Sequence, residues 1–207
     1  MNVDAPMTRP VVLYINGLYY GVYDLDEDMN KDYLVNHYGA DEDDVDIVRR
    51  NATALAGSSE SFLDARSLAL NGNTASDETF AKLSERVDVA YFTDYFIAQT
   101  YFANSDMFNQ KYWRAPGVSV KWRPLCFDQD FLLNSSTRNI MANFFSERGV
   151  PSANGTLTNM DIYVGLRRNK AWRKFCAERY VELIVTQFAP ERLTALLDEM
   201  AAELRPE

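Results

Sequence analysis

The residues best suited to chemistry lie in the stretch KWRPLCFDQDFLL, residues 121–133. Asp128 and Asp130 stand one residue apart there, with apolar side chains before and after them. Carboxylates among apolar neighbours lose hydration unless a partner compensates them, and a divalent cation is one such partner. In an extended strand the two acids would face the same way, because side chains alternate. The stretch therefore predicts a metal-binding pair of carboxylates.

A second polar cluster, NSDMFNQ at residues 104–110, directly follows the long apolar run at 87–104. A polar loop on a rigid, buried element is a common location for functional groups. Magnesium takes one or two carboxylates and completes its shell with water and phosphate oxygens, while a separate carboxylate can orient or deprotonate a hydroxyl. Asp106 is therefore the candidate catalytic residue. The candidate metal ligands are Asp128, Asp130 and Asn109.

Each of these features also has an ordinary structural interpretation. An Asp after a helix is more often a cap or turn residue, and an Asp-x-Asp at a strand end is more often a solvated turn. Trp122, six residues before Asp128, would by default belong to the core, since large aromatic side chains dominate burial. The order of the features favours function, because helix, Asp/Asn loop, hairpin and metal-binding Asp follow one another in the large lobe of protein kinases.

Turn and cap residues predict the elements that must position these groups. Residues 11–25 form two β-rich runs joined by Asn16-Gly17, which indicates a hairpin. A second hairpin is expected around the turn 115–117, and its outgoing strand leads to Asp128. A short strand is predicted at 45–51, a long polar excursion at 134–159, and helices at 58–73 (capped by Ser58 or Ser59), 73–87 (capped by Ser76), 87–104, 161–188 and 190–207.

Composition limits the classes of protein to be considered. With 207 residues and 47% hydrophobic content, the chain can bury one substantial core. No run approaches the roughly 18 uncharged apolar residues that a membrane span needs. The net charge of -9 is carried by ten acids and one lysine in residues 24–46, which predicts a solvated acidic surface. Because phosphate backbones require clustered Lys and Arg, nucleic acid is not an expected partner.

The nucleophilic side chains argue against several enzyme classes. Cys126 and Cys176 lie in apolar surroundings, which favours buried thiols over a disulfide, and neither has zinc-site spacing. His37 is the only histidine, so a Ser-His-Asp or Cys-His system would depend on that residue alone. A glycan hydrolase with Asp106 and Asp128 flanking the sugar bond is a further alternative.

Four separated motifs occur in a fixed order along the chain. They are RPVVLYINGLYYGVYDLDED, then DYFIAQTYFANSD with Asn109 and KYWR, then KWRPLCFDQDF, and finally LRRNKAWRKFCAERYVELIVTQFAPERL. Together they resemble the CotH family, the spore-coat-protein-H-like atypical kinases, from about residue 10 to about residue 195. The resemblance implies an α+β, divergent protein-kinase-like fold, consisting mostly of the helical large lobe with a β-hairpin from the small lobe.

The resemblance also implies an activity and assigns roles to residues. Family members bind ATP and a divalent metal such as Mg²⁺ and phosphorylate Ser or Thr in proteins, and many are found at spore or cell surfaces. Asp106 resembles the catalytic-loop aspartate, while Asn109, Asp128 and Asp130 resemble the metal-binding residues. Trp122 resembles the aromatic residue that lies against adenine. The segment from Tyr23 to Glu27 is similar to the connection between the lobes.

Three differences from the family pattern accompany the resemblance. Asp106 and Asn109 are three residues apart, where the family has four or five, and Phe127 replaces a Trp. The first lysine is Lys31, beyond the predicted hairpin. The phosphate-binding lysine is therefore expected upstream, so that residues 1–207 would be a single kinase domain truncated on its small-lobe side. The alternative is an inactive CotH-like surface or spore-coat protein that binds partners.

Overall fold

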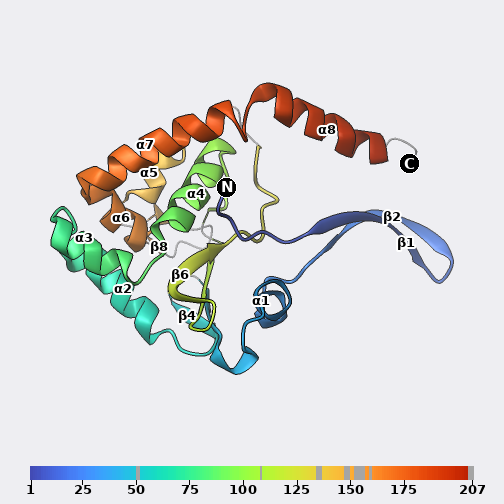
Figure 1. Cartoon of the computed structure of the whole chain (residues 1–207). Helices are drawn as coiled ribbons and strands as arrows, with labels where there is room; N and C mark the ends of the chain where they lie inside the picture. The colour runs from blue at the N-terminus through green and yellow to red at the C-terminus, as the bar shows by residue number, and fades with distance from the viewer. Residues whose placement is uncertain are drawn as a thin grey trace.

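The structure is a computed structural model that describes residues 1–49, 52–107, 109–133, 137–146, 150–151, 157–158 and 160–204 (Figure 1). It is α+β, as predicted, and the kinase-like architecture within that class stays a prediction. A body of helices and a small sheet carries two projecting arms, a β-hairpin and the last helix (Figure 1). None of the described helices combines the length and apolarity needed to cross a membrane.

The sheet of the body has four antiparallel strands in the order β4-β3-β5-β6. Its strands are β3 (Asp46–Arg49), β4 (Thr53–Ala56), β5 (Lys111–Ala115) and β6 (Ser119–Leu125). The register pairs Arg49 with Lys111 and Lys111 with Leu125. The end of β3, the start of β5 and the end of β6 therefore lie at the same end of the sheet. The chain enters β5 from residues 104–110 and leaves β6 into residues 126–130 at this end.

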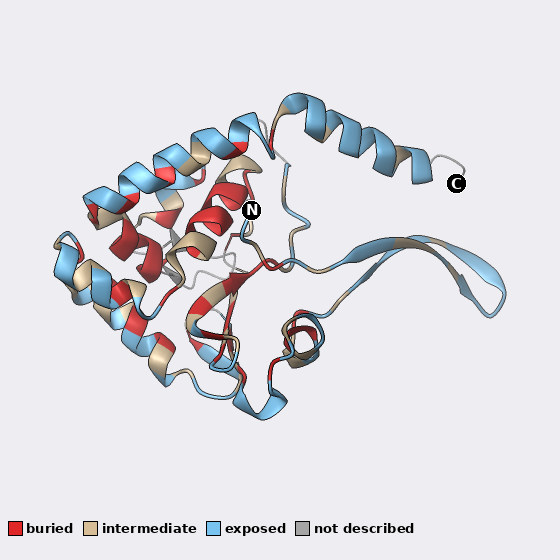
Figure 2. Ribbon diagram, in the orientation of Figure 1, coloured by how far each residue is buried: buried red, intermediate tan, exposed pale blue. Residues whose placement is uncertain are grey.

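Helices cover the sheet and form most of the core. They are α1 (Lys31–Tyr38), α2 (Glu60–Asn71), α3 (Asp77–Ser84), α4 (Val89–Tyr101), α5 (Met141–Phe144), α6 (Asp161–Arg168), α7 (Lys170–Val185) and α8 (Pro190–Leu204), with a 3-10 turn at Glu42–Asp44. The predicted central helix is confirmed, since every residue of α4 from Phe92 to Gln99 is buried (Figure 2). Its end therefore gives the following polar loop a rigid support.

Side-chain caps fix several helix boundaries. Ser76 caps α3 as predicted, accepting a hydrogen bond from the Thr79 N–H. The single helix expected at 161–188 is wrong, because Asn169 divides it into α6 and α7. The Asn169 side chain accepts hydrogen bonds from the backbone N–H groups of Ala171 and Trp172, which is the geometry of a helix start.

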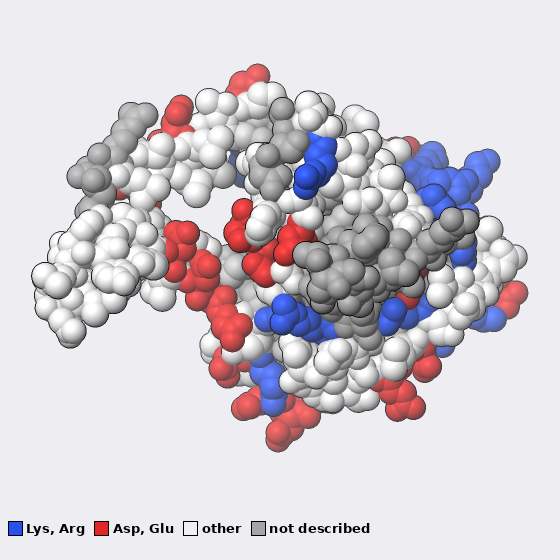
Figure 3. Space-filling view, turned by 180° about the vertical axis from the view of Figure 1, so that it is seen from behind, with Lys and Arg blue, Asp and Glu red and all other residues white. Residues whose placement is uncertain are grey.

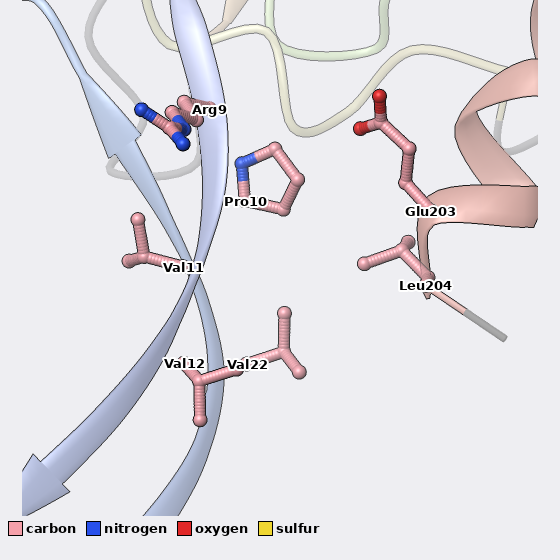
Figure 4. Close-up of a pocket in the computed structure, with 7 residues that line it drawn as sticks. All are labelled: Arg9, Pro10, Val11, Val12, Val22, Glu203 and Leu204. Atoms are coloured by element: carbon pink, nitrogen blue, oxygen red, sulfur yellow. The ribbon is translucent and has the colours of Figure 1, made fainter. Parts of the chain in front are cut away.

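The predicted hairpin at Asn16-Gly17 is confirmed as β1 (Thr8–Ile15) and β2 (Leu18–Asp26). Both turn residues have positive φ, 52° and 80°, which Asn and Gly tolerate best. The hairpin and α8 are exposed along nearly their whole length (Figure 2). The C-terminal end of α8 approaches the middle of the hairpin, where Glu203 and Leu204 face Pro10 and Val22 across an open pocket of about 320 Å³ (Figure 4).

The acidic stretch at 24–46 is mostly solvated, as predicted, but it also contains α1, which the sequence reading missed. Tyr33 and Leu34 bury one face of α1 in a small core around Trp113. Strand β4 was missed as well, and of the predicted excursion the described part includes α5 with a buried Phe144. The cysteines are two buried thiols, as predicted.

Candidate functional site

Two loops meet at the end of the sheet where Arg49, Lys111 and Leu125 lie side by side. Residues 102–107 and 109 belong to the loop after α4, and residues 126–133 follow β6. The backbones are joined directly, because Ser105 N–H donates to the Phe131 carbonyl at 3.2 Å and Leu133 N–H donates to the Phe102 carbonyl at 2.8 Å. The two segments that hold the predicted site residues are therefore fixed relative to each other.

A buried chain of amides reinforces this junction. Gln99, which is 1% exposed on α4, donates through Nε2 to Gln129 Oε1 at 2.6 Å and accepts from Asn104 Nδ2 at 2.7 Å. The Asn104 side chain in turn accepts a hydrogen bond from the Asp106 backbone N–H at 2.8 Å. Buried polar groups need such partners. Through this chain, α4 positions the backbone of Asp106 and the segment that contains Asp128.

Asn109 connects the two predicted carboxylates. Its Nδ2 donates to Asp106 Oδ2 at 2.8 Å and to Asp128 Oδ2 at 2.6 Å. One oxygen of each acid thus lies within 2.8 Å of the same nitrogen, although the residues come from different loops. The structure therefore brings together Asp106, Asn109 and Asp128, and the short spacing of Asp106 and Asn109 does not separate the amide from the acids.

The expected extended geometry of Asp128 and Asp130 is wrong. Strand β6 ends at Leu125, and Asp128 has a left-handed φ of 54°. Side chains alternate only in extended backbone, so the two acids do not have to face the same way. Asp130 is exposed, and in the described part of the chain no hydrogen bond connects it to Asp128 or Asn109.

Two cations border the acids. Arg49 Nη2 lies 3.5 Å from Asn109 Oδ1, and the Lys111 Nζ donates to the Met29 carbonyl at 3.1 Å. Both cations lie over the ring of Phe127, at 5.7 Å for Arg49 Cζ and 4.5 Å for Lys111 Nζ. Burial lowers the pKa of Lys111, and the nearby carboxylates of Asp28 and Asp128 oppose that shift. The edge of the site is therefore positively charged.

The predicted adenine contact, Trp122, lies in the core. Its side chain is 1% exposed, packs against Phe62 with ring centroids 5.0 Å apart, and donates through Nε1 to Ser61 Oγ at 3.2 Å. A planar ligand needs an open ring face, so adenine could lie against Trp122 only if its neighbours moved.

Tyr23 and Glu27 lie at the hairpin rather than at the acids. Tyr23, on β2, is 46% exposed and stacks on Tyr20. Glu27 follows β2 and accepts hydrogen bonds from the Met7 N–H at 2.9 Å and from His37 Nε2 at 2.8 Å. These bonds lower the pKa of Glu27, that from Met7 most. Glu27 therefore ties the base of the hairpin to α1.

The donor set fits a hard divalent cation with few protein ligands. Among the described residues, no three His, Cys, Asp or Glu side chains lie close enough to form a full metal cage. Magnesium, however, commonly takes only one or two carboxylates and keeps its other positions for water and phosphate oxygens. Asp106 and Asp128 supply two carboxylate oxygens around one point. Asn109 would join them as a ligand through Oδ1 instead of Nδ2.

Sequence reasoning missed the supporting residues Arg49, Lys111, Gln99 and Gln129. Arg49 and Lys111 are 62 positions apart and become neighbours only through the register of β3 and β5. A polar Gln99 within the apolar run of α4 is the one signal that was available, because a buried amide needs partners.

Comparison with known proteins gave one family. The family described as "CotH kinase protein" has a model that matches residues 1–207, the whole chain. No curated protein matches the chain.

Proposed function

The chain belongs to the CotH family, and on that premise we propose that it is a magnesium-dependent kinase that transfers the γ-phosphoryl group of ATP to Ser or Thr of a protein. The observation that carries the proposal is the convergence of Asp106 and Asp128 on the Asn109 amide. Phosphoryl transfer is catalysed mainly by positioning and by charge stabilisation. Asp106 and Asp128 lie on two loops that are hydrogen-bonded to each other, and this meets the requirement for positioning.

The three residues would have different tasks. Asp106 would orient the attacking hydroxyl and accept its proton. Asp128, with Asn109 or Asp130, would hold Mg²⁺, which when bound neutralises charge on the phosphate oxygens. The amide chain through Gln99 would keep the two acids at a constant separation, and a misplacement of about 1 Å can cost roughly a hundredfold in rate.

The proposed contacts to the nucleotide come from the hairpin and from the core rather than from the two loops. We propose that residues from Tyr23 to Glu27 contact the nucleotide, since they connect the hairpin to the body next to α1. Trp122 would contribute to adenine binding only after a rearrangement around Phe62. An exchange of Phe62 for Ala that changed ATP affinity without a loss of folding would support that role.

The direct test is transfer of radiolabelled phosphate from ATP to a library of Ser- and Thr-containing peptides in the presence of Mg²⁺. Asp106→Asn and Asp128→Asn should each abolish transfer, while Asp41→Asn, at an exposed acid of the 3-10 cap, should not. Each substitution is nearly isosteric, so the variants should fold. Transfer that persists in both site variants would disprove the assignment.

A non-enzymatic binding protein is the second candidate. The observation in its favour is the exposure of large apolar side chains on both faces of the hairpin, among them Leu18, Tyr20 and Leu25 at more than 60%. Exposed apolar patches of this kind usually mark interaction surfaces. A folded protein with no affinity for ATP and Mg²⁺, but with self-association that Leu18→Asp prevents, would favour this role over the kinase.

A further inference from the structure

The sheet presents two cations next to each other at the site. Arg49 ends β3 and Lys111 begins β5, directly opposite each other in the antiparallel register. Two like charges in this position repel each other, yet both are held over the same Phe127 ring. Contact with an aromatic face offsets part of the repulsion. An anion placed between them would offset far more.

Existing partners neutralise these cations only weakly. The nearest acid to Lys111 is Asp28, with Nζ and Oδ1 3.8 Å apart and the Asp28 side chain 73% exposed. The Lys111 side chain is only 13% exposed, but the pair is long and its acid is solvated, so it contributes little. Arg49 is exposed, and in the described part of the chain no carboxylate lies within ion-pair distance of it. Its Nη2 instead faces the amide oxygen of Asn109 at 3.5 Å.

The acids of the site repel a polyphosphate, and a bound Mg²⁺ would offset only part of that charge. Asp106 and Asp128 carry negative charge toward the space where a metal-bound phosphate would lie. The family's phosphate-binding lysine is expected upstream of residue 1, and the hairpin contains no lysine, because the first lysine is Lys31. Acidic and basic side chains lie next to each other on the face seen in Figure 3, at the opening between the arms and the body.

We propose that Arg49 and Lys111 are the phosphate-binding cations of this site and hold the polyphosphate of a magnesium-bound nucleoside triphosphate beside Asp128. The inference rests on the proposed function, and it assigns to β3 and β5 a task that the sequence reading placed upstream of the chain. Arg49 suits it because a guanidinium makes two parallel hydrogen bonds to phosphate. Lys111 would act as a point charge.

The test is calorimetric titration of the whole chain with three probes: MgATP, magnesium tripolyphosphate and adenosine. Arg49→Gln and Lys111→Met should each weaken MgATP and tripolyphosphate binding about tenfold, as expected for one lost charge-assisted contact. Adenosine affinity should not change. Lys82→Met removes an equal charge from an exposed Glu78 pair on α3 and is the matched control.

The outcomes separate the two proposals. If the wild type binds MgATP and both variants bind it equally well, the cation pair is disproved and the kinase proposal survives. If the wild type binds tripolyphosphate through Arg49 but not MgATP, the cation pair stands and the nucleotide site fails. If it binds neither probe, both proposals are wrong. Arg49 is exposed, so Arg49→Gln should fold even if Lys111→Met does not.

Discussion

Asn109 is the residue on which the candidate site depends. It donates two hydrogen bonds from one nitrogen to acids of different loops, at 2.8 and 2.6 Å. A neutral donor that holds two like charges together takes the position that a cation would otherwise fill. The residue thus makes the acids compatible in the protein without metal, and the same carboxylate oxygens remain suited to magnesium.

Asn109→Asp should make folding depend on a divalent cation. The exchange removes the bridging donor and adds a third carboxylate, so the free energy of unfolding should fall by about 1–2 kcal/mol in EDTA. Millimolar Mg²⁺ should restore it, because three carboxylates bind the cation more tightly than two. The measurement is urea unfolding with and without Mg²⁺. Asn109→Ala is the control, which should lose stability and respond to Mg²⁺ less than Asn109→Asp does, because it keeps only the two carboxylates.

Asp4 is a buried acid that anchors the N-terminal segment to the end of β6, where its carbonyl accepts a hydrogen bond from the Cys126 N–H at 2.7 Å. It is 2% exposed, accepts a hydrogen bond from Trp113 Nε1 at 2.7 Å and is bonded to the Tyr38 hydroxyl. Burial raises the pKa of Asp4 above its ordinary value of 3.8, against the lowering effect of these hydrogen bonds. The folded chain therefore holds this proton more tightly than the unfolded chain does.

A raised pKa in the folded state has a defined effect on stability. Between pH 3.8 and the higher folded-state pKa of Asp4, the folded protein binds more protons, so its free energy of unfolding falls as pH rises. Asp4→Asn removes the titration and keeps one of the two acceptor oxygens that Tyr38 and Trp113 use. Urea unfolding from pH 3.5 upward should show that the wild type loses stability relative to Asp4→Asn as the pH rises across this window. A constant difference would contradict the burial effect.

At the scale of elements, local signals were sufficient where the local sequence alone determines the structure. Asn16-Gly17 predicted the first hairpin and Ser76 the start of α3, because turn and cap chemistry acts within a few residues. The all-apolar run predicted the buried α4. The break at Asn169 was missed because both sides have helical patterns, and a cap in the middle of such a run is easily overlooked.

The site could be predicted only in part for a related reason. Asp106, Asn109 and Asp128 were predicted from their order, and the structure brings them together. Arg49 joins them through strand register, which depends on which strands pair across an insertion of β4 and three helices. The left-handed Asp128 also could not be foreseen, since an Asp in that conformation has no distinct sequence pattern.

The close packing of α2 against α6 depends on the absence of a side chain at Gly165. A Cβ on Gly165 would lie 2.7 Å from Ala69 Cβ and 2.8 Å from the Ala69 carbonyl oxygen. Gly165→Ala should therefore force the helices apart and lower the free energy of unfolding by about 1–3 kcal/mol. Urea unfolding would measure it. Gly117→Ala, where a Cβ meets nothing within 4 Å, is the control and should be nearly neutral.

At the scale of the whole molecule, burial is unevenly distributed between body and arms. The side chains clustered around α4 and α6 are almost fully buried. In contrast, α8 contains no buried residue and the hairpin strands are exposed on both faces (Figure 2). A two-stranded hairpin alone is at best marginally stable in water. Glu27 ties the hairpin's base to α1, but this tie does not reach the tip.

This asymmetry predicts two levels of protection in amide hydrogen exchange of the isolated chain. Backbone amides of β1, β2 and α8 should exchange through local opening, at free energies well below that of global unfolding, because few buried contacts are lost when these segments open. Amides of α4 and α6 should exchange only through global unfolding. Mass spectrometry of peptides from a time course would measure both. Equal protection of hairpin and α4 would mean that a partner, such as a second copy of the chain, covers the arms in solution, and dilution should then remove the protection.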